Sequence, residues 1–183
     1  LSISRIHKRR QKVVKLCRDK GHDLEYVNGG GTGSLDSTTL DYSCTEVTVG
    51  SGFYSPTLFD YYKGFKYEPA AAFALEVTRK PKNKMITCAG GGYVASGANS
   101  LDKIPKPYLP TGLKLEPNEL CGEVQPPLHV KKSAFELQIG DPVFFRHAKA
   151  GELCERFNEI ILLRDNKIQA KVKTYRGEGK CFL

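Results

Sequence analysis

The chain has 183 residues, of which 40% are hydrophobic and 26% are charged, a balance typical of a folded globular protein and not of a disordered one. No apolar run approaches the ~20 residues that cross a bilayer, and the chain opens without a signal-peptide pattern, so we expect no membrane partner. The net charge is +8, and the six cysteines are scattered without a Cys-x-x-Cys pair, which favours free thiols and a cytoplasmic location.

Residues 1–66 alternate between helical and extended patterns. The predicted elements are a basic amphipathic helix at 4–20 that ends before Gly21, a strand at Leu24–Val27, a turn or short helix at Leu35–Leu40, a strand at Thr45–Val49, and a helix that Ser55 caps and Pro56 begins, running to Tyr62. This order of elements is typical of an α/β segment with parallel strands.

From about Tyr67 onward, the apolar residues recur with a period of two, which predicts a separate all-β domain at 67–183. The predicted strands are Ala71–Arg79, Met85–Cys88, Leu128–Lys132, Val143–Phe145, Glu159–Leu163 and Lys167–Lys173, with a hairpin turn at 165–167. Residues 101–127 hold six of the ten prolines, and we expect a long irregular excursion there.

Two glycine-rich loops each follow a predicted strand of the first segment. "VNGGGTGSL" spans 27–35 and "GSG" spans 50–52. Bare backbone N–H groups in such loops bind phosphate, and the last two strands of a (β/α)₈ barrel frequently end in a phosphate site. The first loop is neither a P-loop nor a dinucleotide fingerprint, because no Gly-Lys-Ser/Thr follows and Asp36 replaces the third glycine. The alternative is that both loops are tight turns that need glycine for a positive φ.

"EYVNGGGTGSLD" and "TEVTVGSGFYSPTLFD", together with the C-terminal stretch from "GDPVFFRHAKAGELCERF" onward, resemble fold-type III pyridoxal-phosphate enzymes. The similar group comprises D-threonine aldolase, D-serine dehydratase and the amino acid deaminase/aldolase relatives of alanine racemase. The resemblance implies the last β/α units of a (β/α)₈ barrel, followed by a small β domain. It also implies that the cofactor phosphate is bound by Gly30, Gly31, Thr32, Gly33, Gly50 and Ser51.

The family's Schiff-base lysine lies on the first barrel strand, which would precede Leu1. Because the chain opens on Leu1 and its only methionine is Met85, we expect a C-terminal portion of a longer protein, inactive alone. The expected partners are the N-terminal barrel portion and an amino acid substrate, with a homodimer as a candidate assembly. The implied reaction is carbanion chemistry at Cα of a D-amino acid, of β-hydroxy type. Aldolase, dehydratase and racemase activities stay open.

The aldolase and dehydratase relatives also hold a divalent metal in the β domain. His147 and Cys154 lie in the corresponding region, and Glu152 takes the histidine's place when the alignment is anchored on Cys154. Histidine, thiolate and carboxylate suit zinc, or another divalent metal. The alternatives are a surface His147 and a Cys154 that packs as a small hydrophobic residue.

Two basic segments, "HKRRQKVVKLCRDK" and "RKPKNK", offer a competing hypothesis: a non-catalytic β domain that binds a partner or a nucleic acid. No basic sheet with interleaved aromatic residues accompanies them, so we favour one solvated helix face and one exposed hairpin, and expect no nucleic-acid partner. A phosphate-binding enzyme of different chemistry is a third alternative.

Overall fold

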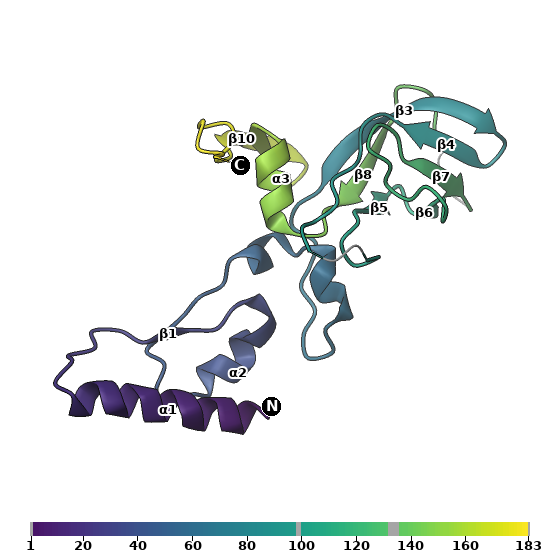
Figure 1. Ribbon diagram of the computed structural model, residues 1–183. Coiled ribbons are helices and arrows are strands. Elements are labelled where there is room, and N and C mark those ends of the chain that lie inside the picture. The colour runs from purple at the N-terminus through teal and green to yellow at the C-terminus, as the bar shows by residue number, and fades with distance from the viewer. Residues whose placement is uncertain (1, 98–99, 132–135, 183) are drawn as a thin grey trace. The chain divides into compact units, whose positions relative to one another are not determined.

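The computed structural model describes residues 2–97, 100–131 and 136–182. It divides into two compact units, Leu1–Phe53 and Tyr54–Leu183, here called the N-terminal unit and the C-terminal unit (Figure 1). This division falls earlier in the chain than the change of sequence period, and a domain boundary at residues 66 and 67 stays a prediction. Within the described ranges, no helix has both the length and the apolar character needed to cross a bilayer.

The N-terminal unit contains helices and two very short parallel strands. Its elements are α1 (Ile3–Asp19), β1 (Asn28–Gly29), the 3₁₀ helix η1 (Thr32–Ser34), α2 (Leu35–Thr39) and β2 (Glu46–Val47). The predicted first helix, the short second helix and the parallel pairing are therefore confirmed. The predicted strand at Leu24–Val27 is wrong: pairing begins at Asn28, opposite Glu46, and ends one residue later. The Val27 N–H donates to the Thr45 hydroxyl at 2.8 Å instead of to a backbone carbonyl, so the ladder does not extend back to Val27.

The segment that joins the two units contains η2 (Ser51–Tyr54), and the C-terminal unit begins with η3 (Thr57–Tyr61). The predicted helix up to Tyr62 is present as the 3₁₀ helix η3, but it begins one residue later than predicted, because Pro56 occupies the N-cap position. Ser55 does not cap it. Its φ is 48° and its hydroxyl donates instead to the Tyr67 carbonyl at 3.1 Å, which fastens the end of the following loop.

The C-terminal unit is built on a six-stranded antiparallel sheet (Figure 1). In chain order its strands are β3 (Phe73–Lys82), β4 (Met85–Cys88), β5 (Lys106–Leu109), β6 (Leu113–Leu115), β7 (Pro127–Val130) and β8 (Pro142–Arg146), arranged in space as β5-β8-β3-β4-β7-β6. The edge strands β5 and β6 lie near each other, so that the sheet curls into a near-barrel. The expectation that 101–127 is irregular is wrong, because this segment supplies both edge strands. An edge strand tolerates Pro107, since one side of the strand needs no N–H donor.

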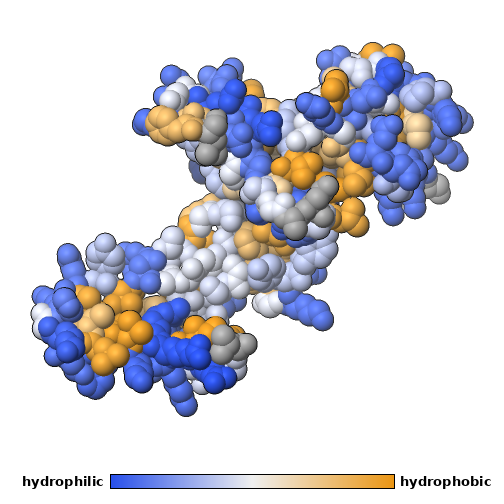
Figure 2. All heavy atoms as spheres, in the orientation of Figure 1, coloured by the Kyte–Doolittle hydropathy of each residue, from blue (hydrophilic) through white to orange (hydrophobic). Residues whose placement is uncertain are grey.

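The core of this unit follows the alternation along its strands. Phe73, Leu75 and Val77 of β3 are buried, as are Val143 and Phe145 of β8, while the residues between them are exposed. The Phe73 and Phe145 rings stack with centroids 5.5 Å apart. The visible surface is mostly hydrophilic with smaller apolar patches (Figure 2), as expected from the composition.

Beyond the sheet, α3 (Ala150–Arg156) leads into the hairpin of β9 (Glu159–Arg164) and β10 (Lys167–Lys173). The hairpin turns at Asp165 and Asn166, whose φ values are 50° and 58°. Two successive residues with positive φ match the twist of a tight hairpin, and the predicted turn is confirmed.

Candidate functional site

The two glycine-rich loops lie together in the N-terminal unit. Residues 30–33 follow β1 and residues 50–52 come after β2, and these two segments are called the loop pair below. Because β1 and β2 are parallel, their carboxyl ends meet at the same edge. The Thr32 hydroxyl accepts a hydrogen bond from the Gly52 N–H at 3.0 Å and lies 3.3 Å from the Ser51 hydroxyl. The structure therefore brings hydroxyl groups from both loops to one place.

The structural need for glycine differs among the positions of the loop pair. Gly30 has a φ of 97°, which favours glycine. A Cβ at Gly52 would lie 2.9 Å from Thr32 Cγ2, so the two loops meet only because Gly52 is bare. A Cβ at Gly50 would have no atom within 4 Å, and the φ of Gly50 is not positive. Neither packing nor backbone conformation within the unit explains glycine at position 50.

The other predicted phosphate ligands lie at the start of η1. Gly31 is the N-cap of this helix, and a Cβ there would also face open space, although its φ of 153° restricts the position to glycine. Thr32 and Gly33 form the first helical residues, and the N–H groups at the start of a helix have no partner within it. Backbone donors and open space at Gly31 and Gly50 fit a bound phosphate group.

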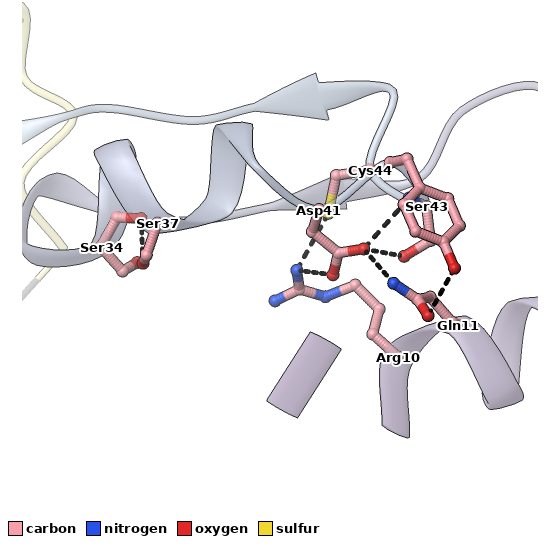
Figure 3. Close-up of polar contacts among 8 residues, drawn as sticks. Arg10, Gln11, Ser34, Ser37, Asp41, Ser43 and Cys44 are labelled. Carbon is pink, nitrogen blue, oxygen red and sulfur yellow. Dashed lines mark hydrogen bonds and ion pairs between the residues drawn. The ribbon is translucent and has the colours of Figure 1, made fainter. Parts of the chain in front are cut away.

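A buried carboxylate, that of Asp41, connects α1 to the chain that follows α2 (Figure 3). Asp41 is 1% exposed, and its two oxygens accept hydrogen bonds from Arg10 Nη1 at 2.7 Å, Gln11 Nε2 at 3.2 Å, and the Ser43 hydroxyl and N–H at 2.7 and 3.1 Å. Burial alone would raise the pKa of Asp41, but the hydrogen bonds from Ser43, Gln11 and Arg10 outweigh it and lower the pKa to about 2. Asp41 thereby fastens α1 to the chain that follows α2.

This network reaches the first loop through Gly29 at the end of β1. A Cβ at Gly29 would lie 2.9 Å from Cys44 Sγ and 3.4 Å from the Arg10 guanidinium carbon. Arg10 Nη1 also lies 3.1 Å from Cys44 Sγ. Sequence reasoning missed this network, because Arg10 was grouped with a solvated basic face. The available signal was Asp41 two residues before Ser43, a spacing typical of a side chain that binds its own backbone.

The predicted metal ligand His147 lies directly after β8 and is 2% exposed, so the alternative of a surface histidine is wrong. Its ring meets the Tyr54 ring edge to face, with centroids 6.3 Å apart. Burial lowers the pKa of His147 to about 4. The backbone of Ala71 acts to raise this pKa, whereas the charge of Arg146 lowers it further. His147 is therefore neutral near pH 7. The Ala71 backbone lies near its ring, but not in hydrogen-bond geometry, and within the described residues neither ring nitrogen has a partner with that geometry.

The other two predicted ligands lie on α3. Glu152 Oε1 accepts from the Ser96 N–H at 2.8 Å, and its Oε2 is buried with no partner in the described chain. Cys154 is half-buried, and burial raises the pKa of its thiol while a hydrogen bond with Tyr54 acts in the opposite direction. Among the residues that the structure describes, no three His, Cys, Asp or Glu side chains are arranged as a ligand set. Metal binding by His147, Cys154 and Glu152 stays a prediction.

Neighbouring segments hold His147 in place. The His147 carbonyl accepts from the Thr57 N–H at 3.0 Å, and Arg146 pairs with both oxygens of Asp60 at 2.9 and 3.0 Å. Thr57 Oγ1 and Arg146 Nε are buried and, like the polar atoms named above, unpartnered within the described ranges. Buried polar atoms rarely lack partners, and several in adjoining residues mark a place for water, an ion or a ligand. No sequence pattern indicates a role for Thr57 or Arg146.

No family model matches the chain, and no curated protein matches it either. Among solved structures, the chain is similar to D-threonine aldolase from Filomicrobium marinum, with a TM-score of 0.81 and 17% sequence identity. The match covers 96% of this chain and 48% of that one, so the chain spans about half the length of the enzyme. At this identity the likeness concerns the fold. The chain has the fold of the C-terminal half of D-threonine aldolase, a fold-type III pyridoxal-phosphate enzyme, as its glycine-rich and C-terminal motifs predict.

Proposed function

We propose that the chain is the C-terminal part of a pyridoxal-phosphate-dependent enzyme that acts on D-amino acids carrying a 3-hydroxyl group. The observation that carries this proposal is the structural similarity to D-threonine aldolase over 96% of the chain. When bound, the cofactor withdraws electrons from Cα of the substrate. Retro-aldol cleavage and β-elimination both start from a substrate with a 3-hydroxyl group, and both belong to the lyases.

The loop pair is the proposed binding site for the cofactor phosphate. The N–H groups of Gly31, Thr32 and Gly33 donate to the phosphate oxygens from one loop. Gly50 and Ser51 donate from the other, and Gly30 provides the turn. The contact between Thr32 and Gly52 supports this role, because it fixes the distance between the two loops before a ligand binds. A preformed site of this kind orients the rest of the cofactor without an ordering cost at binding.

Residues 1–66 then correspond to the last β/α units of a (β/α)₈ barrel, whose earlier part would carry the lysine that binds the cofactor covalently. Exposed apolar residues on α1 support a missing neighbour. Ile6, Val13 and Leu16 are 42%, 59% and 50% exposed, and Val14 alone among the described residues of this helix is buried. A surface helix normally covers such a stripe against the rest of its domain.

The β domain is proposed to hold a divalent metal through His147, Cys154 and Glu152. The unpartnered nitrogens of the neutral His147 and the free Oε2 of Glu152 support this, because a metal ligand must present an unprotonated lone pair. Zinc suits this donor set, and its chemistry would be to polarise the substrate hydroxyl.

Product analysis tests the proposed reaction. The protein that comprises this chain and its N-terminal portion is incubated with pyridoxal phosphate and, separately, with the D and L forms of threonine and serine. We expect turnover of D forms alone. Glycine and an aldehyde indicate retro-aldol cleavage, whereas ammonia and a 2-oxo acid indicate β-elimination. Equal turnover of both enantiomers, or none with either, would contradict the proposal.

Cobalt substitution tests the metal site separately. We expect the chain to bind one Co²⁺ with a thiolate charge-transfer band. Cys154→Ser should abolish this band, and His147→Gln should weaken the affinity for Co²⁺ at least about tenfold, because each substitution removes a ligand. Cys181→Ser is the matched control, since Cys181 is also a half-buried free thiol. A band that survives Cys154→Ser, or that disappears equally in Cys181→Ser, would place the metal elsewhere.

A further inference from the structure

The tip of the β3–β4 hairpin borders a cavity that the proposed reaction does not use. The cavity has a volume of about 270 Å³, and Lys80, Lys82, Lys84 and Lys131 line it. Ile86 and Leu137, both buried, are among the apolar residues that contribute to its wall. Four lysines therefore line a small cavity with a partly apolar wall, and this wall strengthens the electrostatic effect of their charges.

The positive charge of this cavity is poorly compensated. Glu136 is the one acidic residue among the described lining residues, and its carboxylate lies 3.9 Å from Lys80 with 87% of the side chain exposed. An exposed pair at this distance contributes little. In the part of the chain that the structure describes, Lys82, Lys84 and Lys131 have no ion-pair partner. Like charges that converge on one cavity repel one another, and a bound anion relieves that repulsion.

Lys84 occupies a backbone position where lysine is unfavourable. Asn83 and Lys84 form the turn between the paired residues Lys82 and Met85, and the φ of Lys84 is 65°. Glycine or asparagine adopts this conformation at lower cost. The Lys84 carbonyl accepts from the Val130 N–H at 2.9 Å, so the turn is anchored to β7. Lysine at this fixed, strained position indicates a use for its charge.

We infer that this cavity binds a small polyanion carrying two or more phosphoryl groups. The volume of about 270 Å³ lies just below the usual range for ligand sites, which excludes a large ligand. Ammonium groups act as point charges toward phosphate oxygens, and four of them require more negative charge than one phosphate supplies. The site lies within the C-terminal unit and is independent of the loop pair, so its failure would leave the proposed function unaffected.

Titration calorimetry of the 183-residue chain with inorganic tripolyphosphate tests this inference. Apart from any binding at the loop pair, we expect one saturable site that binds tripolyphosphate at least about tenfold more tightly than orthophosphate at equal ionic strength, because multiple phosphoryl groups engage several lysines at once. The double variant Lys84→Gly, Lys131→Gln should weaken tripolyphosphate binding at least about tenfold. Its melting temperature should not fall, since glycine relieves the strained turn.

Lys167→Gln together with Lys171→Gln is the matched control. It removes the same charge from β10, where both side chains are exposed, and should change the affinity less than about twofold. Equal weakening by the two double variants would overturn the inference, because binding would then follow net charge alone. Absence of a saturable site in the wild-type chain would overturn it too. A single-stranded oligonucleotide bound equally by the wild type and both variants would indicate a diffuse basic surface and likewise contradict a built site.

Discussion

Asp41 shows how a residue that carries no family motif determines local structure. Its carboxylate accepts hydrogen bonds from α1 and from the chain after α2, and these hold its pKa at about 2, below the ordinary 3.8. A carboxyl group whose pKa is lower in the folded state stabilises the fold above its unfolded pKa. This stabilisation is fully present above about pH 4 and is lost as the pH falls from the unfolded pKa of 3.8 through the folded pKa of about 2.

Asp41→Asn should therefore destabilise the N-terminal unit by about 1–3 kcal/mol at neutral pH, because Arg10 loses its counter-charge. The wild type should lose on the order of 2 kcal/mol of unfolding free energy through Asp41 between pH 4 and pH 2, reduced by solvent screening, and Asp41→Asn should not show this loss. Urea unfolding across this pH range measures both effects. Asp36→Asn, at an exposed site in the first turn of α2, should leave them unchanged. An unaltered acid transition in Asp41→Asn would refute this role.

At the scale of elements, the alternation along β8 separates two neighbouring phenylalanines. Phe145 is 0% exposed and stacks on Phe73 in the core, whereas Phe144 is 40% exposed on the opposite face. Phe145→Ala should cost about 3–5 kcal/mol of unfolding free energy, because it removes a buried ring and leaves a cavity. Phe144→Ala should cost about 1 kcal/mol or less. Chemical denaturation of the two variants gives both values, and equal losses would contradict the register of β8.

The elements that sequence predicts well are those with local patterns. The helix at 4–20 follows from its apolar spacing, and the strands at Met85–Cys88 and Lys167–Lys173 were predicted with the observed bounds. Strands β5 and β6 were missed because they lie in a proline-rich segment: Pro107 lies within β5, and Pro110 and Pro117 flank β6. Only the tertiary position at the sheet edge makes Pro107 acceptable within a strand. Ser55 was misread as a helix cap because its hydrogen bond goes to a distant carbonyl, which no local pattern reveals.

At the scale of the whole molecule, one part of the candidate site was predictable from the sequence and another part was not. That the two glycine loops lie together was predictable, since each follows one of two strands predicted to be parallel. Phosphate binding by these loops stays a prediction. The burial of His147 was not predictable from the sequence, because it depends on contacts with Tyr54 and Thr57, which lie far earlier in the chain. The near-barrel sheet and the parallel strand pair together match half of D-threonine aldolase, at a sequence identity of 17%.

The affinity for pyridoxal phosphate, compared with that for pyridoxal, tests the central claim most directly. It is measured by titration of the protein that comprises this chain and its N-terminal portion, in wild type, Gly50→Ala and Gly64→Ala. At both positions an added Cβ has no atom within 4 Å and φ is not positive, so neither change should affect folding. We predict that Gly50→Ala reduces the preference for the phosphorylated form at least about tenfold, because its methyl group takes space that the phosphate needs. Gly64→Ala should keep the full preference, and an undiminished preference in Gly50→Ala would contradict a phosphate site at the loop pair.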